Sequence, residues 1–125
     1  QKNWRRVSFL ANYTYLDNYN KSDDRPLDAL SDHSLSFDVT LRPIEPLRLT
    51  VLALYGSKSY WFDSSTSKVL EIPSYFNLDA VAAYSLKVCD VFVKATNIFD
   101  SYVYTEPGFP WRGRFFEIGA HIPIF

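Results

Sequence analysis

Cysteine is almost absent from the 125-residue sequence, which contains only Cys89. One cysteine cannot form a disulfide within the chain, and alone it makes no cysteine metal site. We interpret Cys89 as a small apolar residue near a turn. The two histidines, His33 and His121, are far apart and have no cysteine partners, so we expect no metal ligation and no cofactor.

The sequence also lacks an excess of one charge and a long apolar run. Lysine and arginine total 13 against 14 aspartate and glutamate, so there is no electrostatic reason to expect nucleic acid binding. No segment reaches the roughly 20 apolar residues of a transmembrane helix, although a barrel strand would escape this test because only alternate residues face lipid. Residues 1–6 are not a signal peptide, because no apolar core follows their positive charges. We expect the chain to be a fragment of a longer protein.

Catalytic motifs are missing as well. The chain has four glycines, no Gly-x-Ser-x-Gly sequence and no glycine-rich phosphate loop. Acidic side chains occur as Asp23-Asp24, as Asp38 with Asp79, and as Glu117. Acid–base catalysis needs two carboxylates held close together with separated pKa values, and nothing in the sequence brings such a pair together. We therefore predict no catalytic residue and no enzyme.

Alternating apolar and polar residues, by contrast, fill most of the chain. Aromatic residues make up 18 % of it and, with Val, Ile and Thr, favour a pleated and half-buried surface. Period-two alternation over long segments predicts strands. The six predicted strands are residues 5–17, 33–42, 47–61, 75–86, 91–96 and 113–125. The predicted fold is all-β, with six long antiparallel strands in meander order.

The connections between these strands are alternately long and short. The long ones are the polar loops 18–31, 62–73 and 100–112, and the short ones are turns at 43–46 and 87–90. Strands that cross an outer membrane need about 9–11 residues, with short turns on one side and long loops on the other. Soluble sandwiches more often have strands of about 5–6 residues. Bacterial barrels have at least about 8 strands, so we predict an arc of a larger transmembrane β-barrel.

Each predicted strand has an apolar face for lipid and a polar face for the barrel interior. The apolar faces carry residues such as Phe9, Val39, Val51, Ala80 and Phe116. Aromatic residues near strand ends are expected to form the girdles at the membrane interfaces. They are Tyr13, Tyr15, Tyr55, Tyr60, Trp61, Tyr84, Tyr102, Tyr104 and Trp111. Ordinary core aromatics of a soluble β protein are the alternative.

The last third of the chain has the most distinctive order of residues. It runs K-A-T-N-I-F-D-S-Y-V-Y-T-E-P-G-F-P-W-R-G-R-F-F-E-I-G-A-H-I-P-I-F over residues 94–125. This order resembles the C-terminal end of TonB-dependent outer-membrane receptors, whose last two strands carry an N-hydrophobic-F-D … Y … G-x-P … G-R pattern and usually end in Phe. The matching residues are Asn97, Phe99, Asp100, Tyr104, Gly113, Arg114 and Phe125.

The resemblance implies structural roles for these residues. They would end one strand, hold the last long loop and start the closing strand, with Gly113 accepting backbone angles at the corner that other residues resist. Phe125 departs from the family pattern, since Phe116, Ile118, Ala120, Ile122 and Ile124 place it out of phase. Either a bulge shifts the register near His121 to Pro123, or Phe125 lies just past the membrane.

The resemblance also implies a function for the intact protein. It would import a scarce small-molecule ligand (a ferric siderophore, cobalamin or an oligosaccharide) across the outer membrane of a Gram-negative cell. A periplasmic TonB-type coupling protein would supply energy through an N-terminal plug domain. Residues 1–125 would form the C-terminal segment of the barrel, in contact with lipid, the remaining strands and the plug, and the C-terminus would be periplasmic.

Charged residues on the polar faces would contact the plug or line the ligand path, or else form a charge-paired wall. They are Arg6, Asp38, Arg42, Arg48, Lys58, Asp79, Lys94 and Arg114. Two other kinds of protein remain open at this point. One is a self-contained soluble β-barrel or sandwich that binds a ligand. The other is a small outer-membrane pore or adhesin assembled from several copies. The identity of the ligand does not follow from the sequence.

Overall fold

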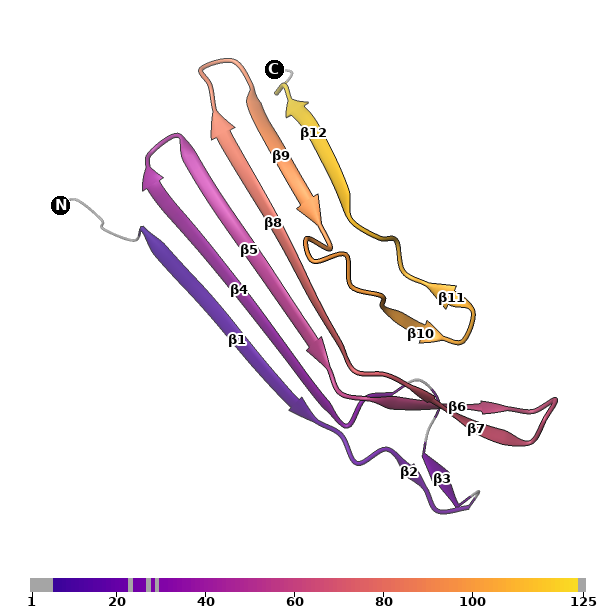
Figure 1. Cartoon of the computed structure of the whole chain (residues 1–125). Helices are drawn as coiled ribbons and strands as arrows, with labels where there is room; N and C mark the ends of the chain where they lie inside the picture. The colour runs from indigo at the N-terminus through magenta and orange to yellow at the C-terminus, as the bar shows by residue number, and fades with distance from the viewer. Residues whose placement is uncertain (1–5, 23, 27, 29, 124–125) are drawn as a thin grey trace.

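The computed structural model describes residues 6–22, 24–26, 28 and 30–123, and six long strands form its main sheet. Neighbouring strands pair in the order β1-β4-β5-β8-β9-β12, and every pair is antiparallel (Figure 1). The strands are β1 (Val7–Tyr15), β4 (His33–Ile44), β5 (Leu47–Gly56), β8 (Tyr75–Ser85), β9 (Asp90–Thr96) and β12 (Phe115–His121). The described residues include no helix long and apolar enough to cross a membrane.

Three small hairpins lie at one end of this sheet, and both short turns lie at the other end, where β12 also finishes (Figure 1). Each hairpin interrupts one of the three long connections. The hairpins are β2 (Tyr19–Asn20) with β3 (Arg25–Pro26), β6 (Ser59–Asp63) with β7 (Lys68–Ile72), and β10 (Tyr104–Glu106) with β11 (Phe109–Pro110). We call this side of the sheet the hairpin end and the opposite side the turn end.

The strand register aligns an apolar residue from each of the six strands on one face. Because paired residues in an antiparallel sheet point to the same side, one row of partners can be followed across the whole sheet. This row is Phe9, Val39, Val51, Ala80, Ala95 and Phe116. Phe9 is 75 % exposed and Ile118 is 81 % exposed. None of the described residues therefore forms a layer against this apolar face.

Within the described residues, Ile72 and Val103 are the hydrophobic side chains that are fully buried. Both lie in the connections at the hairpin end and not in the long strands. A soluble domain of this size would bury one face of its sheet against a second layer. Among the described residues, the six-strand sheet has no second layer, and its order β1-β4-β5-β8-β9-β12 confirms the predicted antiparallel meander of six strands.

The structure corrects one predicted turn. β4 continues to Ile44, and the turn consists of residues 45–46 only. Arg42 and Pro43 on β4 lie opposite Arg48 alone on β5, because the register shifts between Leu41 and Ile44. Two residues against one form a β-bulge, which accommodates a proline that has no N–H to donate to the ladder.

The predicted strand 5–17 is Val7–Tyr15 in the structure, and two other predicted strands are shortened further. The segment 47–61 ends as a sheet strand at Gly56, and Tyr60 and Trp61 belong to the β6–β7 hairpin. The last strand covers Phe115–His121 and pairs with β9 without a register shift, so there is no bulge in this ladder. It stops before Pro123, and Phe125 lies outside the described residues.

Candidate functional site

On β1, β4, β5 and β8, the polar face has no charged residue in the two rows next to the hairpin end. Two rows of paired residues cross it there on β1, β4, β5 and β8. They are Thr14, Ser34, Gly56 and Tyr75, followed by Asn12, Ser36, Leu54 and Asn77. Leu52 and Leu54, which blur the alternation in the sequence, lie on this polar face opposite Asp38 and Ser36. The face thus combines hydroxyl and amide groups with a few apolar side chains.

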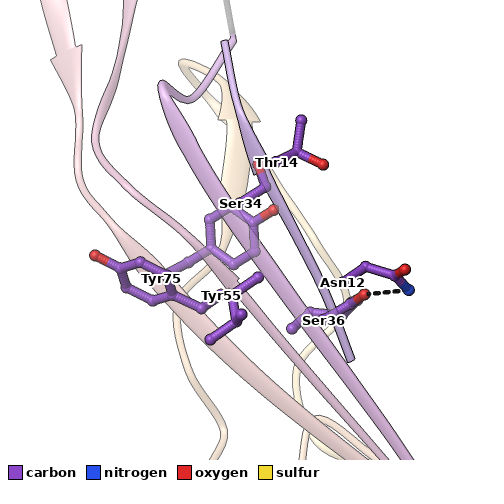
Figure 2. A pocket seen from close by; sticks show the side chains of 8 residues that line it. Asn12, Thr14, Ser34, Ser36, Tyr55 and Tyr75 are labelled. Atoms are coloured by element: carbon purple, nitrogen blue, oxygen red, sulfur yellow. Dashed lines mark hydrogen bonds between the residues drawn. The ribbon is translucent and has the colours of Figure 1, made fainter. Parts of the chain in front are cut away.

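A shallow hollow of about 110 Å³ opens among these residues (Figure 2). Asn12 Nδ2 donates a hydrogen bond to Ser36 Oγ at 3.4 Å across β1 and β4. The lining of the hollow also includes Leu35 on β4 and Tyr55 on β5, which lie between the polar positions along those strands. The full lining is Asn12, Thr14, Ser34, Leu35, Ser36, Leu54, Tyr55 and Tyr75. None of the eight carries a formal charge.

Aromatic rings border the hollow on the β8 side. The half-buried Tyr75 ring lies so close over Gly56 that a Cβ there would come within 2.4 Å of it. The glycine therefore makes room for the ring. Trp111, which is 45 % exposed, packs beside Tyr75 with ring centroids 5.9 Å apart. Together, the two residues form an aromatic pair from β8 and the last loop.

Charged residues lie farther along the polar face, toward the turn end. Asp38 and Asp79 are partners of Leu52 from opposite sides, so β5 separates these carboxylates by two strand spacings, about 10 Å. Two further hollows of about 170 and 260 Å³ are lined partly by Arg6, Arg42 and Arg48. The ion pairs that join two described residues, Arg25–Asp28 and Lys58–Glu71, lie instead in the connections at the hairpin end.

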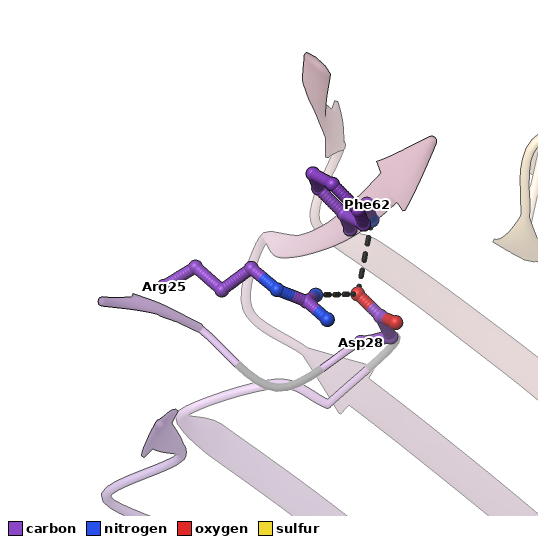
Figure 3. A network of polar contacts seen from close by, with 3 residues as sticks. All are labelled: Arg25, Asp28 and Phe62. Carbon is purple, nitrogen blue, oxygen red and sulfur yellow. Dashed lines mark hydrogen bonds and ion pairs between the residues drawn. The ribbon is translucent and has the colours of Figure 1, made fainter. Parts of the chain in front are cut away.

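One carboxylate joins the first two long connections (Figure 3). Asp28 Oδ1 accepts a hydrogen bond from Arg25 Nη1 at 2.9 Å and another from the backbone N–H of Phe62 at 2.9 Å. The Arg25 guanidinium also lies over the Phe62 ring, 4.3 Å from its centroid. Asp28 forms an isolated bridge with Tyr60 as well. The β6 strand is thereby held against the loop that contains β3.

The β6–β7 hairpin has polar groups that fix its turn. Asp63 accepts hydrogen bonds from the side chains of Ser65 and Thr66 and from the Ser65 backbone, and these bonds lower the pKa of its carboxyl group. Lys58 was expected on the barrel interior but lies between β5 and β6, with Nζ 3.6 Å from Glu71 Oε2. Hydrogen bonding to Tyr60 and the nearby Glu71 charge raise the pKa of its ammonium group.

The family model described as "TonB dependent receptor-like, beta-barrel" matches residues 1–98 of the sequence, which is most of the chain. The chain belongs to the TonB-dependent receptor-like β-barrel family. Members of this family are transporters of the outer membrane and not enzymes. A search of curated proteins found no match.

Two solved structures share the fold of this receptor segment. The siderophore receptor PirA from Acinetobacter baumannii aligns with a TM-score of 0.80 at 14 % identity, over 96 % of this chain and 20 % of that one. The ferripyoverdine receptor of the outer membrane of Pseudomonas aeruginosa, bound to ferripyoverdine, aligns with a TM-score of 0.75 at 18 % identity, over 93 % and 17 %. The segment therefore spans about a fifth of the length of these receptors.

In the receptor segment, Asn97 connects β8, β9 and the last loop. It is 3 % exposed and has a positive φ of 51°. Its side chain donates to the carbonyl oxygens of Ser101 and Arg112 and accepts from the Ser101 N–H. Its own N–H donates to Asp79 Oδ1 at 2.8 Å. Asp79 is therefore part of this hydrogen-bond network, and it is not paired with another carboxylate.

Asp100 and Gly113 meet where the last loop enters β12. Asp100 Oδ1 accepts the Arg114 N–H at 2.7 Å, and a Cβ on Gly113 would lie 2.9 Å from the same oxygen. The φ of Gly113 is outside the left-handed region, which Gly108 occupies instead. The expected reason for Gly113 is therefore corrected, because it provides space for the carboxylate and not an unusual backbone angle.

The structure also describes Phe99 and the backbone pairing of Tyr104, two further residues of the motif. Phe99 packs against Phe76 with centroids 6.0 Å apart, so it extends the apolar face beyond β8. Tyr104 pairs with Pro110 in the β10–β11 hairpin, and its side chain lies outside the described residues. Among described residues, no cluster of His, Cys, Asp or Glu side chains could hold a metal ion.

Several expected girdle aromatics lie at the ends of the apolar face of the receptor segment. Tyr13 and Tyr15 pack around His33 at the hairpin end, where Tyr13 Oη is 2.7 Å from His33 Nδ1. Tyr84 is on the same face near the turn end, paired with Leu47. The sequence reasoning did not identify Asp28 or the Tyr75–Trp111 pair, because both depend on contacts between segments far apart in the chain.

Proposed function

We propose that residues 1–125 form the C-terminal part of the barrel of an energy-coupled outer-membrane transporter. The intact protein would import a scarce small-molecule ligand, with energy from a TonB-type coupling protein acting on a plug domain. The observation that carries this proposal is the sheet with one unbroken apolar face in a chain of this family. Such a face needs lipid around it, and lipid accepts strands only in a closed barrel.

The arrangement of connections supports an orientation for the segment. In outer-membrane barrels the short turns are periplasmic and the long loops are extracellular. The hairpin end would then face the outside, with β2–β3, β6–β7 and β10–β11 available to a ligand. β12 would run inward and leave the C-terminus on the periplasmic side, because it finishes at the turn end (Figure 1).

Three classes of ligand fit this proposal: ferric siderophores, cobalamin and oligosaccharides. The two receptors with a similar fold are named for a siderophore and for ferripyoverdine. The charged residues of the polar face, including Asp38, Arg42, Arg48 and Lys94, would face the plug or the ligand path. Asp38, Arg42, Arg48 and Lys94 form no ion pair with another described residue, so we expect their charges to meet groups outside residues 1–125.

A soluble ligand-binding module fits the observations poorly, because the exposed Phe9, Phe116 and Ile118 side chains would all contact water. A closed oligomeric pore would satisfy the apolar face but would transport without energy. Uptake of labelled ferric siderophores, cobalamin and oligosaccharides by cells expressing the full-length receptor separates these functions. We expect uptake of one class, abolished by a protonophore and by deletion of the coupling protein. Uptake that survives both treatments would contradict the proposal.

A further inference from the structure

We propose that two glycine–aromatic pairs on the polar face select the register in which strands joined by long connections pair. They are Gly56 with Tyr75, in the β5–β8 ladder, and Gly119 with Phe92, in the β9–β12 ladder. We call them the register pairs. This inference concerns the assembly of the sheet and does not depend on which ligand the receptor transports.

The alternation of apolar and polar residues does not define the register of these strands. A slip by one residue would turn every side chain of a strand to the other face, but a slip by two residues would not. In the β9–β12 ladder, for example, a two-residue slip would place Ala120 opposite Val93 instead of Val91, and the lipid-facing row would still be apolar. Another feature must therefore distinguish the native register from a slipped one.

Short turns supply that feature in two of the ladders. In a hairpin, the length of the loop determines which residues pair, and this applies to β4–β5 and β8–β9 (Figure 1). The ladders β1–β4, β5–β8 and β9–β12 are joined instead by the long connections, which each contain a small hairpin of their own. Connections of that length are compatible with several registers. The register pairs occur in two of these three ladders, and β1 and β4 contain no glycine.

Each glycine of a register pair provides the space for the ring opposite it. A Cβ added at Gly119 would come within 3.0 Å of the Phe92 ring, and one added at Gly56 would come within 3.0 Å of the Tyr75 ring. Any side chain at either position would therefore displace the ring. Glycine otherwise weakens a strand, yet the two glycines that belong to the long strands both face an aromatic residue. Aromatic rings placed over strand glycines are one way to fix a register.

In a slipped ladder, each ring would meet a side chain instead of a glycine. A two-residue slip of β12 would bring either Glu117 or His121 opposite Phe92. A two-residue slip between β5 and β8 in one direction would bring Leu54 opposite Tyr75. These side chains would need the space that the ring fills in the native register. The register pairs therefore disfavour the slipped ladders that the apolar face would accept.

Oxidative cross-linking of cysteine pairs reads the register of β12 in cells that express the full-length receptor without its other cysteines. Val93→Cys is combined with Ile118→Cys for the native register, and with Phe116→Cys or Ala120→Cys for the two slipped registers. These positions lie on the apolar face, so the reporter cysteines leave the register pair intact. The receptor with its register pair unchanged should cross-link through the native pair alone. Phe92→Ala should convert part of the native cross-link into a slipped one.

Phe115→Ala is the matched control, because Phe115 is an aromatic residue of the same ladder and face but lies opposite Thr96. It should keep the native cross-link alone. The reversed pair, Phe92→Gly with Gly119→Phe, should restore the native cross-link, since a ring and a glycine again face each other. Native cross-linking alone in Phe92→Ala would overturn the inference, as would slipped cross-links of equal strength in Phe115→Ala.

Cross-linking in cells detects folded and misassembled receptor alike, and heat-dependent gel mobility shows which of them is folded. A Phe92→Ala receptor that fails to fold and gives no slipped cross-link would therefore also overturn the inference.

The β5–β8 ladder is tested in the same way with Tyr75→Ala. Val51→Cys is combined with Ala80→Cys for the native register, and with Leu78→Cys or Ala82→Cys for the slipped registers. We expect slipped cross-links in Tyr75→Ala and none while Tyr75 is present. Native cross-linking alone in Tyr75→Ala would overturn the inference for this ladder.

Discussion

At the scale of single residues, Asn97 shows how one side chain organises the end of this sheet. Its side-chain amide forms hydrogen bonds with backbone groups of Ser101 and Arg112. These two residues lie in the last loop, one on each side of the β10–β11 hairpin. Asparagine also tolerates a positive φ better than most residues. The residue therefore serves as both the strand end and the anchor of the loop.

Substitutions at Asn97 should separate these two contributions. Asn97→Gly keeps access to the left-handed backbone conformation and loses the side-chain hydrogen bonds, whereas Asn97→Ala loses both. We expect Asn97→Ala to lower the free energy of unfolding by about 1–3 kcal/mol or more, because buried partners are left unsatisfied, and Asn97→Gly to cost less. Guanidinium unfolding of the full-length receptor in lipid vesicles measures both. An equal loss of unfolding free energy in the two variants would mean that access to the left-handed backbone conformation does not contribute to stability.

Two neighbouring residues test the assignment of the sheet faces. Val39 belongs to the apolar row and Thr40 to the polar face, where its Oγ1 lies 3.2 Å from Thr50 Oγ1. Val39→Arg should reduce the free energy of unfolding by about 2–4 kcal/mol if it lies at the bilayer midplane. Thr40→Arg should cost much less, since its side chain would point into the barrel. The same unfolding measurement in vesicles applies, and similar costs for the two variants would reject the assignment.

At the scale of elements, the hairpins are tied to one another as well as to the sheet. We expect Asp28→Ala to detach β6 from the first long connection, because Asp28 accepts both the Arg25 side chain and the Phe62 N–H. Amide exchange at Phe62 should accelerate by about two- to tenfold, the effect of losing one hydrogen bond of about 0.5–1.5 kcal/mol. Hydrogen exchange with mass spectrometry measures this.

The control for Asp28→Ala is Glu71→Ala, which removes an ion pair with Lys58 in the same β6–β7 hairpin. Both partners of that pair are more than half exposed, and exposed pairs contribute little. The exchange of the Phe62 amide should therefore stay the same in Glu71→Ala. Faster exchange in both variants would show that the hairpin responds to any lost charge.

The β6–β7 turn should also depend on pH through Asp63. Since its hydrogen bonds lower the pKa below the ordinary value of 3.8, the folded turn favours the carboxylate. The stabilisation is therefore complete above the ordinary value and is lost as the pH falls through the lowered pKa. Carbon-13 NMR of labelled aspartate, assigned with Asp63→Asn, should show a titration below pH 3.8. A titration at or above that value would contradict the hydrogen-bonded turn.

The long strands could be predicted from the sequence because alternation is a local property. The same rule missed β6 and β7, since Tyr60 and Trp61 continue the alternation of β5 past Gly56 and no local signal marks the change of sheet. The turn residues Asp63 and Ser65, between two apolar segments, were the available indication of a hairpin. At Pro43 the sequence predicts a turn and the structure has a bulge, because proline is typical of both.

At the scale of the whole molecule, β12 covers the outer edge of β9 along its full length. Deleting residues 115–125 from the full-length receptor would leave that edge unpaired in the hydrocarbon, where each unsatisfied group costs several kcal/mol. We expect no folded receptor in the outer-membrane fraction, as measured by heat-dependent gel mobility. Deleting the β10–β11 hairpin, residues 104–110, is the control and should leave folded receptor. Folded receptor without β12 would show that another strand replaces it.

The candidate site was less accessible to sequence reasoning than the fold. The register brings Asn12, Ser36 and Tyr75 together from three strands, and no local pattern indicates that they share one hollow. Gly56 is informative only once Tyr75 is known to lie above it. The motif residues around Asn97 were found because they lie close together in the sequence, whereas contacts across the sheet required the pairing of strands.

The uncovered apolar face has a consequence for how this sequence can diverge. A soluble core selects side chains by shape, and a large-to-small change there costs about 2–5 kcal/mol. Fluid lipid has no fixed shape, so positions such as Phe9, Val51 and Ile118 need only remain apolar. Their identities can drift almost freely while the backbone stays the same. The low identity to receptors that share this fold is what a surface selected for hydropathy alone permits.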